Sequence, residues 1–123
     1  MRYLTDRKRA MGRGAGHTGT QHHWAMQVSA VALATMVPWW VYIFGHALGG
    51  TRPEVLDTFG RPFPAILTGL LLIVGMRHFA MGATTMIEDY AHGTWRKALI
   101  IGAVSLSWAI AATGLFALAR IAL

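Results

Sequence analysis

One histidine lies deep inside a long apolar stretch of this chain, in the sequence GLLLIVGMRHFAMGATTMIEDYAHG. That residue is His78, and a carboxylate and a phenol, Asp89 and Tyr90, close the stretch. Hydrocarbon penalises ionisable groups, so an ionisable residue inside a membrane-length segment indicates a functional site. A buried imidazole beside small residues is suited to be an axial ligand of a flat porphyrin. The alternative is a histidine that only hydrogen-bonds between helices.

Small residues flank this histidine at helical spacing. At about 100° per residue, Gly75, His78, Gly82, Thr85 and Asp89 fall along one stripe of a helix. Because glycine has no side chain, a large planar ligand can approach the backbone at Gly75 and Gly82. Six-coordinate haem would need a second axial ligand, either from a partner subunit or from a distant histidine of this chain.

Arg77 directly precedes the histidine and points to another side of the helix. A guanidinium at this depth is costly and needs an anion or a path to water. Haem propionates or a partner carboxylate would supply the anion, whereas snorkelling toward the headgroups is the alternative. About 10 residues, roughly 15 Å, separate Arg77 from the end of the apolar stretch. That distance favours pairing over snorkelling.

Tyr90 and Asp89 are placed where an interfacial site is expected. Tyrosine is common at membrane interfaces for its amphipathic ring alone. A phenol O–H also donates to a carbonyl oxygen, and a neighbouring carboxylate orients donors or carries protons. Twelve residues, about 18 Å along a helix axis, separate His78 from Tyr90. A haem edge and an interfacial quinone would both fit within that length.

The elements that must hold these residues are membrane spans. Apolar residues make up 54% of the chain and charged residues only 13%, a composition typical of membrane proteins. We predict an all-α fold with three transmembrane helices, over about residues 24–48, 64–87 and 98–119, preceded by a polar, basic segment over residues 1–23. Residues 51–63 are expected to form a short polar connection. The absence of cysteine excludes iron–sulfur ligation by this chain.

The basic residues predict the orientation of the three spans. Five lysines and arginines lie before the first span and two in the connection before the third, against two in the first connection and one at the C-terminus. Lysine and arginine are retained on the cytoplasmic side, so the N-terminus is predicted to be cytoplasmic and the C-terminus periplasmic. With spans beside it, the basic N-terminal cluster is interpreted as a topology signal, and no nucleic-acid partner is expected.

These residues resemble a known family. His78, Gly82, Asp89 and Tyr90, in the order His-x-x-x-Gly and then Asp-Tyr, are similar to the pattern of the small membrane-anchor subunit (the D subunit) of succinate dehydrogenase, respiratory complex II. The segments EDYAHG and HHWAMQVSAVAL resemble proteobacterial members. The resemblance extends from about His22 onward, with its specific motif confined to the first two spans.

The resemblance implies the cofactors, the partners and the location. His78 would be an axial ligand of haem b and so bind the haem iron, with the second histidine coming from a second, cytochrome b-type anchor subunit. Tyr90 would hydrogen-bond ubiquinone, with Asp89 beside it. The chain would lie in membrane lipid and anchor a flavoprotein and an iron–sulfur protein to the membrane. Those two partners would hold the flavin and the iron–sulfur clusters. The bacterial inner membrane, or the mitochondrial inner membrane in a eukaryote, is the expected location.

One position departs from the family pattern. Many relatives have an arginine in the first span near the haem propionates, where Gln27 stands here, and Arg77 is the residue that would compensate. Ser29 matches a small hydroxyl position. Two alternatives stay open on the residues alone: the anchor of a fumarate reductase or another b-type cytochrome complex, and a non-redox structural or transport subunit.

Overall fold

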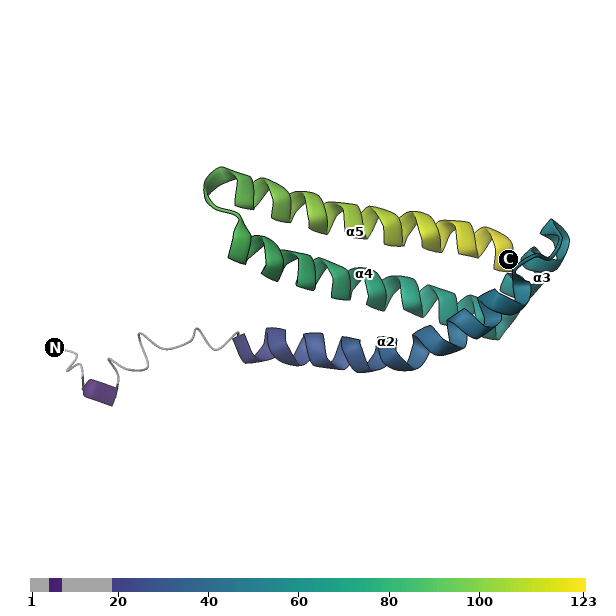
Figure 1. Cartoon of the computed structure of the whole chain (residues 1–123), viewed down its shortest axis with the longest axis horizontal. Helices are drawn as coiled ribbons and strands as arrows, with labels where there is room; N and C mark the ends of the chain where they lie inside the picture. Colours follow the sequence, from purple (N-terminus) through teal and green to yellow (C-terminus); the bar gives the residue numbers. More distant parts are fainter. Residues whose placement is uncertain (1–4, 8–18) are drawn as a thin grey trace.

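The computed structural model describes residues 5–7 and 19–123, so most of the predicted N-terminal segment lies outside the described residues. Over residues 19–123 the chain forms four helices and no strand (Figure 1). These are α2 (Gly19–Ala47), α3 (Arg52–Gly60), α4 (Pro62–Tyr90) and α5 (Gly93–Ala122). The predicted all-α fold class is confirmed.

Three of these helices are long and apolar enough to cross a membrane: α2, α4 and α5. The longest, α5, has 30 residues, and at 1.5 Å per residue it is roughly 45 Å long. The hydrocarbon core is only about 30 Å thick, so the helices extend beyond it. α2 begins at Gly19 and α5 at Gly93, each five residues before the predicted span, so both helices continue beyond the apolar stretch. The chain is a multi-pass membrane protein.

The three long helices form a layer with α4 in the middle, as Figure 1 shows. α4 packs against α5 on one side and α2 on the other, whereas α2 and α5 do not pack together within the described residues. Close approach of α4 and α5 depends on Gly114, where a Cβ would lie 2.9 Å from Cδ1 of Leu72. Small residues serve this purpose widely in membrane helices. α2 bends in Figure 1, and it contains Pro38, which removes one helix hydrogen bond.

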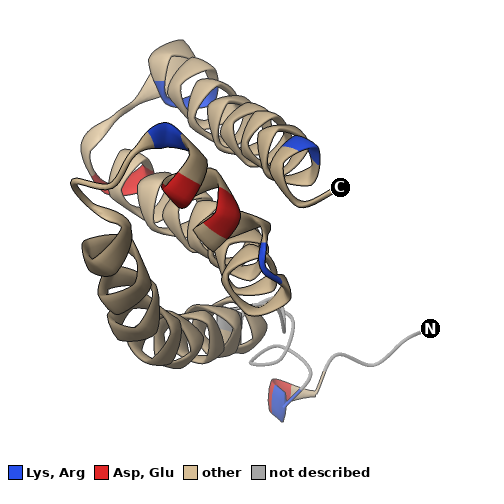
Figure 2. Cartoon of the chain, turned by 90° about the vertical axis from the view of Figure 1, so that its right-hand side faces the viewer, with Lys and Arg blue, Asp and Glu red and all other residues tan. Residues whose placement is uncertain are grey.

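The connection between the first two spans contains a helix that the sequence analysis did not predict. α3 begins after Thr51, whose backbone N–H and hydroxyl donate to the Glu54 carboxylate at 2.7 and 2.8 Å. Arg61, just after α3, pairs with Asp57 at 2.6 Å. The T-x-x-E spacing, with Pro53 in the first turn, is a helix-start signal that was available in the sequence. Figure 2 shows most charged residues on α3 and near the ends of the long helices.

Little of the chain is buried within itself. The buried hydrophobic side chains of the described residues are Leu67 and Ala111, and many large apolar side chains, such as Trp24 and Phe116, are exposed. In a membrane such surface faces lipid or another protein. The layer of helices therefore has both faces available for contacts beyond this chain.

Candidate functional site

The helix pair α2 and α4 positions His78, and its register is defined by four contacts. A glycine or a polar residue of α4 meets a residue of α2 at each of them, and the two helices run antiparallel. Two of the contacts are hydrogen bonds: Ser29 to His78 at 2.8 Å and Trp40 to Thr68 at 3.1 Å. The other two bring side chains of α2 against glycines of α4. A Cβ placed on Gly82 would lie 3.8 Å from Met26, and one placed on Gly75 would lie 3.8 Å from Leu33.

His78 is half-buried and directed toward α2. Its Nδ1 lies 2.8 Å from the hydroxyl oxygen of Ser29. Nε2 has no hydrogen-bond partner among the described residues. Every fully buried side-chain nitrogen or oxygen in the described part of the chain does have such a partner. Nε2 therefore reaches the surface of this chain. One ring nitrogen is therefore bonded inside the chain, and the other has no partner among the described residues.

The two glycines of the predicted stripe also face α2. A Cβ on Gly75 would lie 3.8 Å from Leu33, and one on Gly82 would lie 3.8 Å from Met26, both ordinary contact distances. The stripe that contains His78 is therefore part of the contact surface between α2 and α4. A planar ligand that reaches Nε2 would approach along the edge of this contact, beside flexible Leu33 and Met26 side chains.

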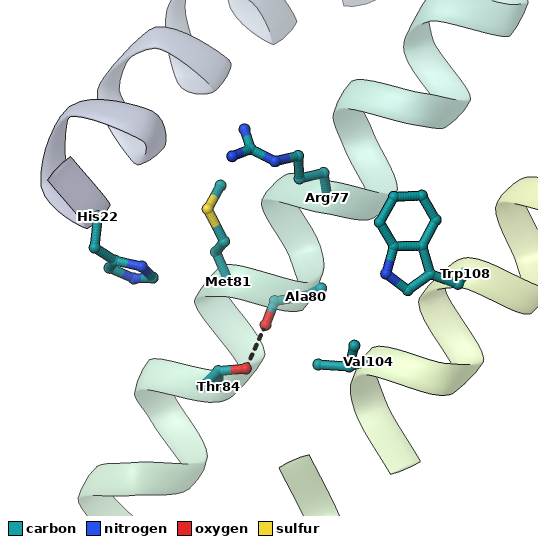
Figure 3. Close-up of a pocket in the computed structure, with 7 residues that line it drawn as sticks. All are labelled: His22, Arg77, Ala80, Met81, Thr84, Val104 and Trp108. Carbon is teal, nitrogen blue, oxygen red and sulfur yellow. Dashed lines mark hydrogen bonds between the residues drawn. The ribbon is translucent and has the colours of Figure 1, made fainter. Parts of the chain in front are cut away.

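Arg77 is exposed and lines a cavity of about 230 Å³ with residues of all three long helices (Figure 3). Its guanidinium extends away from Trp108, toward the side on which α2 lies. No carboxylate of the described residues lies within ion-pair distance of it. The other residues around the cavity, which are mostly apolar, are His22, Ala80, Met81, Thr84, Val104 and Trp108. This cation thus lacks an anion within the described part of the chain.

Gln27 lies apart from Arg77 and His78. It is two residues from Ser29, about 200° around α2, and it lines a different cavity of about 240 Å³ with His23 and Trp24. Its amide nitrogen is 3.5 Å from Nε2 of His23. The structure therefore brings His78 and Ser29 together, but it does not bring Gln27 and Arg77 into one cavity.

Asp89 and Tyr90 form the last turn of α4, and both are exposed. Asp89 is eleven residues after His78 and so lies on nearly the same face of the helix as His78. Tyr90 is rotated by about 120° around the helix axis from His78. Tyr90 is 84% exposed, and no described residue accepts a hydrogen bond from its hydroxyl. A site built on these two residues would be completed by a ligand or another subunit.

A metal centre held by this chain alone is not found among the described residues. No three histidine, cysteine, aspartate or glutamate side chains gather there closely enough to hold an ion. His78 would thus contribute a single ligand to any metal. Two other histidines lie elsewhere: His46 contacts the ring of Tyr42 in a tilted arrangement, with 4.4 Å between ring centroids, and His92 immediately precedes α5.

Together these features define a class of protein: a membrane protein of three long apolar helices, with an imidazole held between two of them and two exposed polar residues at the end of α4. Over residues 1–116 the chain matches the family described as the succinate dehydrogenase/fumarate reductase transmembrane subunit. The chain belongs to that family, and the predicted family is confirmed.

One relative extends the match over the whole chain. The succinate dehydrogenase hydrophobic membrane anchor subunit of Paracoccus denitrificans is 51% identical over 123 residues, which are 100% of this chain and 95% of the relative. No solved structure gives a significant match. The similarity therefore covers all three long helices and the segment before them.

The bond between Ser29 and His78 is the feature of the site that the sequence analysis did not predict. A small hydroxyl residue in an apolar run was the available signal. It could not identify the partner, because all faces of α2 are largely apolar and hydrophobic periodicity leaves the register of α2 against α4 undetermined.

Proposed function

We propose that this chain is the small membrane anchor of a succinate dehydrogenase. In this role it associates with a second membrane-anchor subunit and holds an iron–sulfur subunit and a flavoprotein at the membrane. Family membership and the 51% identity to a succinate dehydrogenase anchor over the full chain support the assignment. The complex is placed in the bacterial inner membrane, with the N-terminus cytoplasmic as the basic residues predict.

Within this role, His78 is proposed to ligate the iron of haem b through Nε2. The observation that carries this proposal is the difference between the two ring nitrogens of His78. Nδ1 is bonded to Ser29, whereas Nε2 has no partner among the described residues and reaches the surface of the chain. Metal-binding histidines commonly have their other ring nitrogen held in this way. The donor set fits a group shared between two subunits, because no cluster of metal-binding side chains accompanies His78 among the described residues and a second ligand would come from a partner.

The residues around His78 would orient the ligand and exclude water. Haem b, when bound, accepts and donates single electrons. α2 covers one side of the imidazole through Ser29, and the apolar side chains of Leu33 and Met26 line the edges of the same contact. Arg77 offers a positive charge without a carboxylate partner in the described chain, which suits the anionic propionates.

The end of α4 is proposed to contribute to a ubiquinone site. Tyr90 donates its phenol proton to a quinone carbonyl, and Asp89 orients or relays protons there. Both side chains are exposed, and they lie about 16 to 18 Å along the axis from His78. Their exposure supports a site completed by partner subunits at the membrane interface.

The test of ligation is a reduced-minus-oxidised optical spectrum of the complex purified through this chain, with dithionite as reductant. We expect b-type bands in the parent complex and their loss or conversion to a high-spin form in His78→Ala. His46→Ala, at the exposed end of α2, is the matched control and should keep the parent spectrum. Normal low-spin b-type bands in His78→Ala would overturn the ligand assignment.

Tyr90→Phe tests the quinone role separately. Removing one hydrogen bond should lower quinone reduction roughly tenfold, the effect of losing about 1.4 kcal/mol. Succinate oxidation with an artificial acceptor should stay at the parent rate, because the flavoprotein is untouched. Tyr42→Phe, within α2, is the control. Parent quinone turnover and inhibitor sensitivity in Tyr90→Phe would remove Tyr90 from the site.

A fumarate reductase anchor is the second candidate, because the matched family includes both complexes. The direction of the reaction is set by the quinone and the catalytic subunits, which are other chains. Comparing succinate oxidation with fumarate reduction in the purified complex distinguishes the two. A complex without haem and without dehydrogenase partners would instead indicate the structural or transport subunit considered above.

A further inference from the structure

We propose that Ser29 is the positioning residue of His78: its hydroxyl accepts the Nδ1 proton and thereby fixes the tautomer that leaves the lone pair of Nε2 free for a metal. This inference rests on the proposed haem ligation. It adds a residue of a second helix, α2, to the site. The contact between α2 and α4 would then also orient the imidazole of His78, in addition to packing the two helices.

The surroundings of the Ser29 hydroxyl limit where its proton goes. Ser29 is only 6% exposed. Its oxygen lies 2.8 Å from the carbonyl oxygen of Ala25, 3.0 Å from that of Met26 and 2.8 Å from Nδ1 of His78. A hydroxyl has one proton and two lone pairs, and carbonyl oxygens can only accept. The three contacts therefore cannot all receive a proton from Ser29.

One arrangement satisfies these contacts. Ser29 donates its proton to a carbonyl of its own helix, and Nδ1–H of His78 donates to the serine oxygen. In the reverse arrangement the proton goes to Nδ1, and the serine oxygen then faces two carbonyl oxygens at 2.8 and 3.0 Å with no proton between them. Such unpaired polar contacts are unfavourable in a medium of low dielectric constant. The contacts thus assign the proton to Nδ1.

The tautomer has a direct consequence for the second nitrogen. A neutral imidazole carries one N–H, so a proton on Nδ1 leaves Nε2 with a lone pair. Nε2 has no hydrogen-bond partner among the described residues and reaches the surface of the chain. Ser29 is anchored to α2 by its carbonyl bond and so also restricts rotation of the ring. The geometry presents Nε2 as a ligand before any metal arrives.

The chain contains a close internal comparison. Ser107 on α5 is the other buried serine of the described residues, 2% exposed, and its hydroxyl donates to the Ala103 carbonyl four residues earlier at 2.7 Å. Like Ser29 it is buried and bonds to the carbonyl four residues earlier, but it has no histidine hydrogen-bonded to it. Ser107→Ala therefore controls for the loss of a buried hydroxyl without the loss of an imidazole partner.

The experiment measures haem retention in the whole complex purified from cells with all its subunits. Partner removal around a metal ligand typically weakens metal affinity by about 10- to 100-fold. Haem transfer from the complex to excess apomyoglobin should be faster by about that factor in Ser29→Ala. Ser107→Ala should match the parent rate. Ser29→Thr, which keeps the hydroxyl, should restore slow transfer.

A spectroscopic reading separates positioning from packing. Because the ring would be free to rotate or change tautomer, the low-spin electron paramagnetic resonance signal of the ferric complex should broaden or shift in Ser29→Ala and return in Ser29→Thr. Should Ser29→Ala fail to assemble, Ser29→Cys keeps a similar volume with a weaker hydrogen bond, and faster haem transfer is expected from it.

The outcomes distinguish this inference from the ligation on which it rests. Normal haem in His78→Ala would overturn both. Loss of ligation in His78→Ala, together with parent behaviour in Ser29→Ala, would overturn the positioning role and leave His78 as the ligand. Equal acceleration in Ser29→Ala and Ser107→Ala, with no change in the resonance signal, would show an effect of packing and also overturn the positioning role.

Discussion

Arg77 and His78 are consecutive residues of α4, yet only His78 has a partner within the described chain. His78 bonds to Ser29, whereas Arg77 projects into a cavity where no carboxylate lies within ion-pair distance. An unpaired guanidinium at membrane depth is costly. Its charge is therefore expected to be neutralised by a group from outside the chain, for which haem propionates are the proposed source.

Arg77→Gln tests that pairing. Removing a positive charge near haem favours the oxidised, more positive iron. The midpoint potential should fall by on the order of 60 mV, a tenfold change in the ratio of oxidised to reduced haem. Redox titration of the purified complex measures it. Arg77→Lys should retain most of the parent potential.

Gln27 offers a further check at the residue scale. Because it lines a separate cavity, the shifts of Gln27→Ala and Arg77→Gln should add in the double variant, as they do for sites without shared partners. An unchanged haem content and potential in Arg77→Gln would remove Arg77 from the haem surroundings.

At the scale of elements, α3 depends on a cap that titrates. Glu54 accepts hydrogen bonds from the backbone N–H and the hydroxyl of Thr51, and these bonds hold the pKa of Glu54 below its ordinary value of 4.5. A carboxyl whose pKa is lowered on folding stabilises the folded state above its unfolded pKa. The stabilisation is lost as pH falls through the lowered pKa.

Hydrogen exchange of α3 measures this pH dependence. Protection factors over residues 52–60 of the detergent-solubilised complex should fall on acidification below about pH 4.5. Glu54→Gln should lower them already at neutral pH. Protection in Glu54→Gln that equals the parent at neutral pH would show that the cap contributes nothing to α3.

Hydropathy predicted the three long helices well, because about 20 apolar residues in a row have few alternatives in a membrane. It failed for α3, which is polar and begins at a cap formed by Thr51 and Glu54 rather than at an apolar stripe. It also could not predict the contact of Ser29 with His78, since pairing of residues 49 positions apart depends on helix register. Composition indicates which segments are helical, but not which faces meet.

At the scale of the whole molecule, this chain is a layer of helices rather than a closed bundle. α4 touches both neighbours, and large apolar side chains are exposed along all three long helices. The open nitrogen of His78 and the exposed hydroxyl of Tyr90 lie on such surfaces. In the proposed role, these groups would be completed by a second membrane subunit that covers the exposed apolar surface.

The orientation of this layer is testable because the chain contains no cysteine. Thr94→Cys, in the first turn of α5, reports on the end of α5 that follows α4, and Leu123→Cys reports on its opposite end, where Leu123 is fully exposed. A membrane-impermeant maleimide should label Leu123→Cys in right-side-out spheroplasts and Thr94→Cys in inverted vesicles. Labelling after denaturation gives the total for each variant.

The reversed pattern would contradict the charge argument and move the proposed quinone site to the other face of the membrane. Asp89 and Tyr90 lie a few residues before Thr94, at the same end of α4. In the proposed role, electrons from succinate would reach the membrane on the side where the flavoprotein and the iron–sulfur subunit dock. A quinone site built on Tyr90 requires that end of α4 to face the same side, so the labelling pattern tests the topology and the placement of the site together.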